Sequence, residues 1–333
     1  MFSLRKNNWR AYNFTTLTTV VEVGYHDPQL VCFAHERRVR VVSIANYPTN
    51  QLSNSSARSQ WVQDKLKFTL TQHLDGINFD FEDAISSTRI DLKDGLSKLV
   101  EETYRVFKKA DPRLQITFDV AWSPDCIDQR CYDYFRIASS TDFLFVMSYD
   151  ERSQIYDECI AWANSALNTT IHGVERYSKI GIPIEKLVLG VPWYGYDYPC
   201  IKYEVETRKC WIKKVPFRGV NCSDASGSQR NIEDIAAFSK NYTVHWEKIA
   251  ESPYFTYFNN AKKIYHQIWF DNVDSLKIKY KYAIIRRLRG LGAWNADAVG
   301  KDQTKKMWSA LPCYKCNEMR SDNSIVAYQL QNK

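Results

Sequence analysis

Apolar and polar side chains alternate along Leu74-Asp75-Gly76-Ile77-Asn78-Phe79-Asp80-Phe81-Glu82. Successive side chains of a β-strand point to opposite faces, so Asn78, Asp80 and Glu82 share one face and the apolar residues share the other. Two neighbouring carboxyl groups repel each other, and this repulsion raises the pKa of one until it can serve as a general acid. A solvated edge strand would alternate too, but would carry Lys, Thr or Gln as readily as two acids. The segment therefore predicts a catalytic strand.

Strand and helix patterns alternate through most of the chain, which predicts βα units around a parallel sheet. The helical pattern is clearest at Asp91–Lys109, where apolar residues recur at helical spacing. Polar or aromatic residues follow most predicted strands, which is where a (β/α)8 barrel carries its active site. We therefore expect an α/β fold, a (β/α)8 TIM barrel. Its strands are predicted at Leu17–Val23, Arg40–Ile44, Gly76–Glu82, Gln115–Trp122, Asp142–Ser148, Lys186–Pro192, His266–Phe270 and Gly290–Trp294.

The length of 333 residues and the hydrophobic content of 44% suit one large domain. We expect the catalytic barrel at 1–312, an inserted segment at about 198–258 between late strands, and a C-terminal tail at 313–333. The net charge of +7 is modest, and its densest basic runs, Lys277–Lys281 and Arg286–Arg289, are interpreted as helix surface rather than as a nucleic-acid site. No apolar run has the length of a membrane span.

Nine cysteines and five Asn-X-Ser/Thr sequons indicate the secretory route. Met1–Lys6 has no apolar signal-peptide core, so we expect a signal peptide to be missing from this sequence. Zinc is not expected, because no second Cys or His pair stands at ligand spacing. Local disulfides are predicted, with the pairing left open and at least one thiol free, among Cys126/Cys131, Cys200/Cys210/Cys222 and Cys313/Cys316. The sequon asparagines are Asn13, Asn54, Asn168, Asn221 and Asn241.

Four motifs carry a family resemblance. The segment Leu74–Glu82 resembles the signature that ends the fourth barrel strand in glycoside hydrolase family 18, the chitinase family. Motifs resembling those of the sixth, seventh and eighth strands follow in the same order. The likeness runs from about Trp9 to Trp308 and is nearest to a lysosomal member of the family. The later motifs are Phe145-Val146-Met147-Ser148-Tyr149-Asp150, Gly190-Val191-Pro192-Trp193-Tyr194-Gly195 and Gly292-Ala293-Trp294-Asn295.

The resemblance implies a monomeric, lysosomal O-glycosyl hydrolase that needs no cofactor. Its implied substrate is the chitobiose core of asparagine-linked oligosaccharides, cut from the reducing end. In this family the acetamido oxygen of the substrate attacks the anomeric carbon, so one acid suffices for retaining catalysis. Glu82 would protonate the glycosidic oxygen, Asp80 would bind the acetamido N–H, and Tyr149 would orient the acetamido carbonyl.

The resemblance also implies substrate-binding residues. Trp294 would form the floor beneath the sugar, and Asp75 would support Asp80. Asn78 stands where the family more often has Asp, which removes one carboxylate from the strand. Barrel packing is the alternative role for the aromatic residues. The sugar site would be lined by Asp119, Trp122, Asp150, Trp193 and Tyr194.

The N-terminus departs from the family pattern, because only Met1-Phe2-Ser3-Leu4 remains of a first strand. We expect a truncated strand and an open seam that exposes apolar side chains and unpaired backbone groups. Two other functions stay open. A chitooligosaccharide-binding lectin would use the same barrel without the acid, and an endo-chitinase would need an open cleft. The sequence does not decide whether the insertion closes one end of that cleft.

Overall fold

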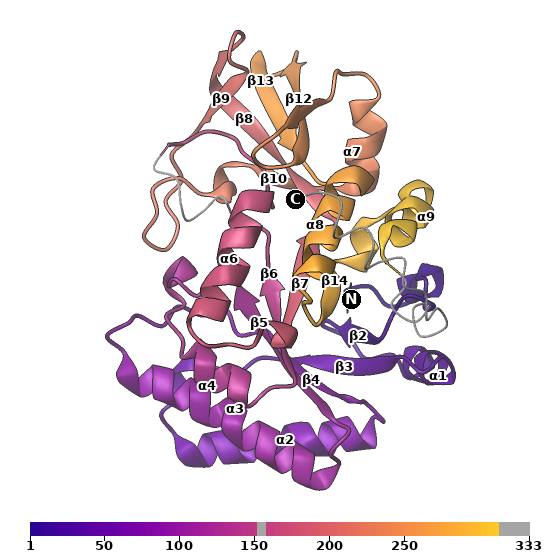
Figure 1. Ribbon diagram of the computed structural model, residues 1–333, viewed down its shortest axis with the longest axis vertical. Coiled ribbons are helices and arrows are strands. Elements are labelled where there is room, and N and C mark those ends of the chain that lie inside the picture. Colours follow the sequence, from indigo (N-terminus) through magenta and orange to yellow (C-terminus); the bar gives the residue numbers. More distant parts are fainter. Residues whose placement is uncertain (152–157, 313–333) are drawn as a thin grey trace.

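Eight parallel strands form the main sheet of the computed structural model, which describes residues 1–151 and 158–312. The strands lie in chain order, and helices cover the outside of the curved sheet (Figure 1). The fold is the predicted (β/α)8 barrel. Its strands are β1 Phe2–Ser3, β2 Thr19–Glu22, β3 Arg40–Ala45, β4 Gly76–Phe79, β5 Gln115–Ala121, β6 Phe143–Met147, β7 Leu187–Pro192 and β14 Gly290–Trp294.

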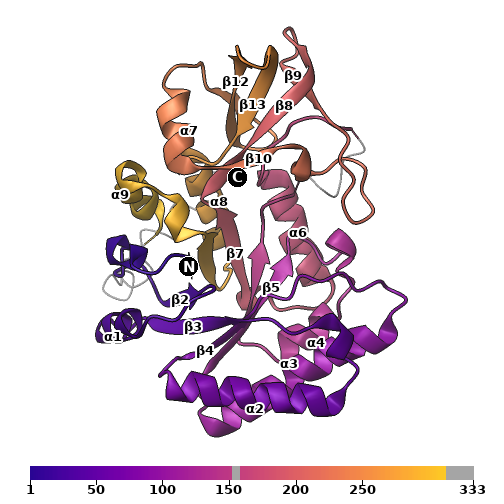
Figure 2. The same cartoon turned by 180° about the vertical axis from the view of Figure 1, so that it is seen from behind.

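The helices of the outer layer match the predicted pattern. Helix α3, predicted at Asp91–Lys109, spans Ile90–Ala110, and it packs between α2 and α4 on one flank of the barrel (Figure 2). The interpretation of Lys277–Lys281 as helix surface is wrong at Lys279, which is 0% exposed within α8. The helices are α1 Pro28–Glu36, α2 Ser55–Thr71, α3, α4 Tyr134–Ser139, α6 Leu167–Lys179, α8 Val273–Ile285 and α9 Lys301–Ala310.

Apolar strand residues divide between the two faces of the barrel wall, as strand alternation requires. Ile77 and Phe79 of β4 belong to the core between strands and helices, whereas Phe145 of β6 belongs to the core inside the barrel. The Phe145 ring lies against two glycines of neighbouring strands. A Cβ atom on Gly190 or Gly292 would lie 2.4 or 2.6 Å from this ring. The two glycines therefore make room for one large aromatic side chain inside the barrel.

The seam between β1 and β14 is closed by side chains, although these two strands form no ladder in the described part of the chain. Phe2 is only 2% exposed, and its ring lies 5.2 Å from that of Trp294. The Asp297 carboxylate, beyond β14, accepts a hydrogen bond from the backbone N–H of Leu4 at 2.6 Å. The expected exposure of apolar side chains at this seam is therefore wrong.

A second, antiparallel sheet interrupts the barrel between β7 and α8 and stands at the end towards which β6 points (Figure 1). It extends from 194 to 269, beyond the predicted insertion at 198–258. The predicted barrel strand His266–Phe270 is wrong, because this segment is β13 of the second sheet. Four consecutive buried residues in β13 imitate a barrel strand. The elements are β8 Tyr194–Glu204, β9 Lys209–Ile212, β10 Ser228–Asn231, α7 Ile232–Ser239, β11 His245–Glu247, β12 Ser252–Asn259 and β13 Ile264–Trp269.

Three disulfides join described cysteines: Cys126–Cys131, Cys159–Cys222 and Cys200–Cys210. Cys222 thus pairs across 63 residues rather than within its sequence neighbourhood. Cys32 is free and exposed. The predicted pair Cys313/Cys316 and the tail 313–333 lie outside the described residues. No helix among the described residues has the length and apolar character of a membrane span. Asn13 is half-buried, and the exposed sequon asparagines are Asn54, Asn168, Asn221 and Asn241.

Candidate active site

Two carboxyl groups lie just beyond the carboxyl end of β4, which ends at Phe79. The Glu82 side chain is 50% exposed, whereas Asp80 is half-buried beneath it. Burial, and then the charge and hydrogen bond of Glu82, raise the pKa of Asp80 to about 7. The pair therefore retains a shared proton until the pH approaches neutrality, which is the property that the alternating segment predicted.

Polar side chains continue below this pair into the barrel. The Asn78 amide donates a hydrogen bond to Asp119 Oδ2 at 2.7 Å and accepts one from the Thr117 hydroxyl at 2.5 Å. Burial, and then the charge of Asp80, raise the pKa of Asp119 well above its ordinary value. A second carboxylate in place of the Asn78 amide would add repulsion at this point. Asn78 and Asp119 are thus hydrogen-bonded to each other inside the barrel, where Asp119 is near enough to Asp80 for the two carboxyl groups to repel each other.

Tyrosines hold two further carboxyl groups across from Glu82. The Tyr194 hydroxyl donates to Asp150 Oδ1 at 2.6 Å, and the Tyr196 hydroxyl donates to Asp224 Oδ2 at 3.2 Å. Burial, and then the charge of Asp224, raise the pKa of Asp150 to about 7. Burial raises the pKa of Asp224 to about 6. Burial also holds the pKa of Tyr149 well above its ordinary value, so its hydroxyl stays a donor.

A cavity of about 240 Å³ lies between these groups. Its volume is below the roughly 300–1,000 Å³ of pockets for drug-sized ligands, so it suits a small group such as one sugar unit. The inserted sheet and its loops supply one wall, which no sequence motif marks. The predicted residues in the lining are Glu82, Trp122, Tyr149 and Asp150. The residues that sequence reasoning missed are Asp128, Arg130, Met147, Tyr196, Phe217, Asp224 and Ala225.

Two arginines contact Glu82 from different segments. Arg130 Nη1 donates to the carboxylate oxygen Oε2 of Glu82 at 2.7 Å, and the Arg130 side chain is 8% exposed. Arg218, on an insertion loop, donates through Nη1 to the backbone carbonyl of Glu82 at 2.6 Å. The insertion is thereby attached directly to the residue expected to be the acid.

Two predicted site residues lie away from the cavity. Asp75 precedes β4, at the amino end of the strand, and accepts hydrogen bonds from the Val41 N–H at 2.7 Å and from His35 Nε2 at 2.8 Å. Trp193 is 0% exposed, and its ring packs against Trp308 with centroids 5.1 Å apart. Asp75 therefore does not lie where it could support Asp80, and Trp193 has the barrel-packing role that was the alternative for the aromatic residues. Asp75 links β3 to β4, and Trp193 is part of the outer core.

Trp294 ends β14 and is partly buried against the barrel core. Its ring contacts Phe2 rather than the lining of the cavity, so its role as the sugar floor stays a prediction. Tyr194 contacts the cavity through Asp150. No three His, Cys, Asp or Glu side chains within residues 1–151 and 158–312 are grouped to hold a metal ion.

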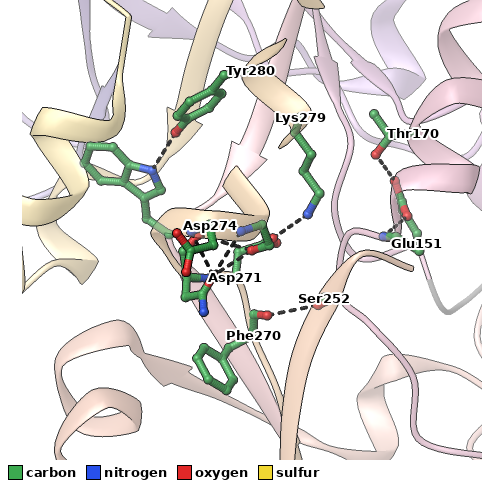
Figure 3. Close-up of polar contacts among 12 residues, drawn as sticks. Glu151, Thr170, Ser252, Phe270, Asp271, Asp274, Lys279 and Tyr280 are labelled. Carbon is green, nitrogen blue, oxygen red and sulfur yellow. Dashed lines mark hydrogen bonds and ion pairs between the residues drawn. The ribbon is translucent and has the colours of Figure 1, made fainter. Parts of the chain in front are cut away.

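Buried ionic groups fix the segment that follows β6 (Figure 3). The Glu151 carboxyl accepts hydrogen bonds from the Ala166 N–H at 2.7 Å and from the Thr170 hydroxyl at 3.2 Å. Ala166 is the N-cap of α6 and has no capping side chain, so the Glu151 carboxyl oxygen supplies the acceptor that this helix N-terminus lacks. Nearby, Lys279 Nζ donates to Asp271 Oδ1 at 2.5 Å. The Glu151 contacts thus join the segment after Asp150, which lines the cavity, to the start of α6.

The model for Glycosyl hydrolases family 18 matches residues 44–298. The chain belongs to this family. As a family 18 member it is a glycosidase. Human di-N-acetylchitobiase is 43% identical over 323 residues, covering 93% of this chain and 82% of that protein. Mouse di-N-acetylchitobiase is 42% identical, and the alignment covers 93% of this chain and 87% of that protein. A probable di-N-acetylchitobiase of Dictyostelium discoideum is 38% identical, and the alignment covers 97% of this chain and 88% of that protein.

Solved family 18 structures share the fold. A Group IV chitinase of Ostrinia furnacalis, in complex with allosamidin, superposes with a TM-score of 0.74 at 18% identity and covers 94% of each chain. The C-terminal domain of a putative chitinase from Desulfitobacterium hafniense DCB-2 has a TM-score of 0.73 at 16% identity, covering 89% of this chain and 90% of that one. At these identities the likeness shows the fold alone.

Proposed function

We propose that this glycosidase hydrolyses the bond between the two N-acetylglucosamine units of chitobiose, in the core of asparagine-linked oligosaccharides, from the reducing end. One arrangement carries the proposal, namely Glu82 at the 240 Å³ cavity with proton-retaining Asp80 beneath it. Relatives that are named di-N-acetylchitobiase support chitobiose as the substrate. Disulfides and exposed sequons support a glycosylated protein of the secretory route that reaches the lysosome.

The proposed reaction is substrate-assisted and retaining. Glu82 gives its proton to the glycosidic oxygen while the bond to the anomeric carbon breaks and the acetamido oxygen bonds to that carbon. Asp80 accepts the acetamido N–H, and the Tyr149 hydroxyl holds the acetamido oxygen in line. Water then attacks the anomeric carbon and returns a proton to Glu82. The acetamido oxygen attacks from the face opposite the leaving group, and water attacks from the face that the leaving group has left, so two inversions retain the configuration.

The wall of the cavity supports release of a terminal sugar. Phe217, Asp224 and Ala225 line it from the insertion, and Arg218 joins that insertion to the backbone of Glu82. A polymer-cleaving endo-chitinase needs a cleft that is open at both ends. Products of a long chitooligosaccharide separate the two functions: single sugars from the reducing end support the proposal, and internal cuts contradict it.

Hydrolysis of chitobiose at acidic pH by the wild type and by Glu82→Gln tests the assignment of the acid. We expect Glu82→Gln to bind the sugar but to lose at least about 100-fold in kcat, because protonation of the leaving group is removed. Asp83→Asn is the matched control, since Asp83 is an exposed neighbouring carboxylate that accepts from Thr49. Turnover by Glu82→Gln within a few-fold of wild type would refute the role. Tight binding without wild-type turnover would favour the lectin.

A further inference from the structure

A short disulfide-closed loop directs a buried arginine at the proposed acid. Cys126 and Cys131 close the loop, and Cys126, Asp128 and Gln129 all have positive φ, at 54°, 53° and 58°. Left-handed backbone is uncommon for residues other than glycine and persists where the surroundings impose it. Three such residues in one closed loop therefore indicate that the surrounding structure imposes the conformation of this loop. Arg130 is the side chain that this winding presents to the cavity.

Arg130 makes two charge-assisted hydrogen bonds. Nη1 donates to Glu82 Oε2 at 2.7 Å, and Nη2 donates to Asp128 Oδ2 at 2.8 Å. The backbone carbonyl of Arg130 accepts from the Tyr134 hydroxyl at 2.8 Å, which holds the loop to α4. A planar guanidinium can bind two carboxylates at fixed angles, whereas an ammonium is a single point of charge. The arrangement therefore fixes the direction of the Glu82 carboxylate as well as its charge.

We propose that Arg130 is a positioning residue that keeps the Glu82 carboxyl group aimed into the cavity between turnovers, so that the single proton of the carboxyl pair waits on Asp80. This inference rests on the proposed function, because it takes Glu82 as the acid. When the substrate enters, the proton moves from Asp80 to Glu82 and on to the glycosidic oxygen. Asp80 is then the carboxylate that faces the acetamido N–H. The proton that Glu82 takes from the attacking water passes back to Asp80, and Glu82 returns to its contact with Arg130 as a carboxylate.

The charges around the pair agree with this distribution of the proton. Burial and Glu82 raise the pKa of Asp80 to about 7, and the charge of Arg130 opposes that rise. Removal of Arg130 therefore lets the pair hold its last proton to a higher pH. A second positive group, Arg218, reaches Glu82 from the insertion loop and contacts its backbone carbonyl rather than its carboxylate. The other titratable groups that interact with Glu82 come from the segment after the loop, from β5 and from the segment after β6, and they carry negative or no charge: Asp119, Tyr132, Tyr149 and Asp150.

The pH dependence of kcat/KM on chitobiose tests the proposal in Arg130→Gln and Arg130→Lys. We expect Arg130→Gln to move the alkaline limb of the profile upwards by about one pH unit. Arg130→Lys retains the positive charge, so the alkaline limb of its pH profile stays at the wild-type pH. Its kcat falls by up to about 100-fold, because the Glu82 carboxyl group is no longer held in the same direction. Arg136→Gln is the matched control, because Arg136 bridges Glu101 and Asp94 outside the cavity. Superimposable profiles of wild type and Arg130→Gln would overturn the proposal.

A second measurement does not need turnover. Infrared spectroscopy follows the protonated carboxyl of Asp80, identified by its loss in Asp80→Asn, across a pH titration. Its midpoint should rise in Arg130→Gln and stay in Arg136→Gln, and an unchanged midpoint contradicts the inference. If the wild type does not hydrolyse chitobiose, the proposed function fails while this titration still decides the role of Arg130. If Arg130→Gln does not fold because Asp128 loses its ion pair with Arg130, the double variant Arg130→Gln with Asp128→Asn removes the carboxylate charge and takes the place of Arg130→Gln in both experiments.

Discussion

Tyr149 illustrates how burial prepares a single residue for its proposed task. Its side chain is 8% exposed, and its ring lies 6.1 Å from that of Tyr194, which packs edge-on against it. Burial and the nearby carboxylates raise its pKa, so the hydroxyl keeps its proton throughout the working range of the enzyme. A phenol held in this way can donate to a developing oxyanion or to an amide oxygen without first losing a hydrogen bond to water.

Tyr149→Phe should lower kcat on chitobiose by about 100-fold or more, with little change in KM, because the lost donor acts mainly on the reacting acetamido group. Steady-state kinetics at acidic pH check this result. Tyr177→Phe is the control, since the buried Tyr177 hydroxyl donates to the Ala121 carbonyl at 2.7 Å away from the cavity. That variant should lose stability and keep its kcat. Equal losses of kcat in both variants would argue against a role for Tyr149 in the reaction.

The sequence predicted those site residues that directly follow a barrel strand, such as Glu82 and Asp150. It missed Asp224 and Arg130, because their places depend on the path of loops and on disulfides that no periodic pattern reports. It misplaced Asp75, since a residue before a strand lies at the opposite barrel face from a residue after it. The motifs thus identified the barrel strands correctly, but they did not always show at which end of the barrel a nearby residue lies.

In strand β14, the effect of one added methyl group on stability depends on its position. A Cβ on Gly292 would lie 2.6 Å from the Phe145 ring, whereas a Cβ on Gly290 would meet only Val188 at 3.9 Å. We expect Gly292→Ala to lower the free energy of unfolding by about 1–3 kcal/mol through overpacking. Gly290→Ala, two residues earlier in the same strand, should be neutral or slightly stabilising. Denaturant titration of both variants measures the difference, and equal stabilities would contradict this account of barrel packing.

The elements themselves were predictable to the extent that their patterns are local. The predicted β14 has the observed bounds, and the predicted helix Asp91–Lys109 is one residue short at each end. Strand β13 was assigned to the wrong sheet, because a run buried on both faces looks the same in a barrel and in a covered antiparallel sheet. Partnership between distant strands depends on tertiary packing, which the pattern of one segment does not contain.

Several carboxyl groups that are buried or half-buried make the whole molecule sensitive to pH. The pKa values of Asp80, Asp150 and Glu151 are raised to about 7, and that of Asp224 to about 6, with burial the largest cause in each. An unfolded chain ionises these groups near pH 4. A carboxyl with a raised pKa in the folded state contributes stability that is complete below pH 4 and is lost as the pH rises through 6 to 7.

The thermal midpoint should therefore be lower at pH 7.5 than at pH 5, as scanning calorimetry at the two values will show. The double variant Asp150→Asn with Asp224→Asn removes two of these groups, so its midpoint should change less between the same pH values. An equal change in the wild type and in this variant would mean that other groups determine the pH dependence.

The Cys159–Cys222 disulfide connects the segment after β6 to the loop region that carries Phe217 and Asp224. By the loop-entropy model, a disulfide that closes a loop of 63 residues raises the free energy of the unfolded chain by about 4 kcal/mol, which is more than a disulfide that closes a loop of ten residues does. In a newly made chain, the loop region with Phe217 and Asp224 is covalently joined to the segment after β6 only once Cys222 has been synthesised and oxidised. Catalytic competence would then arrive with oxidation, so a chain kept in a reducing compartment would possess its acid and yet offer an unfinished site.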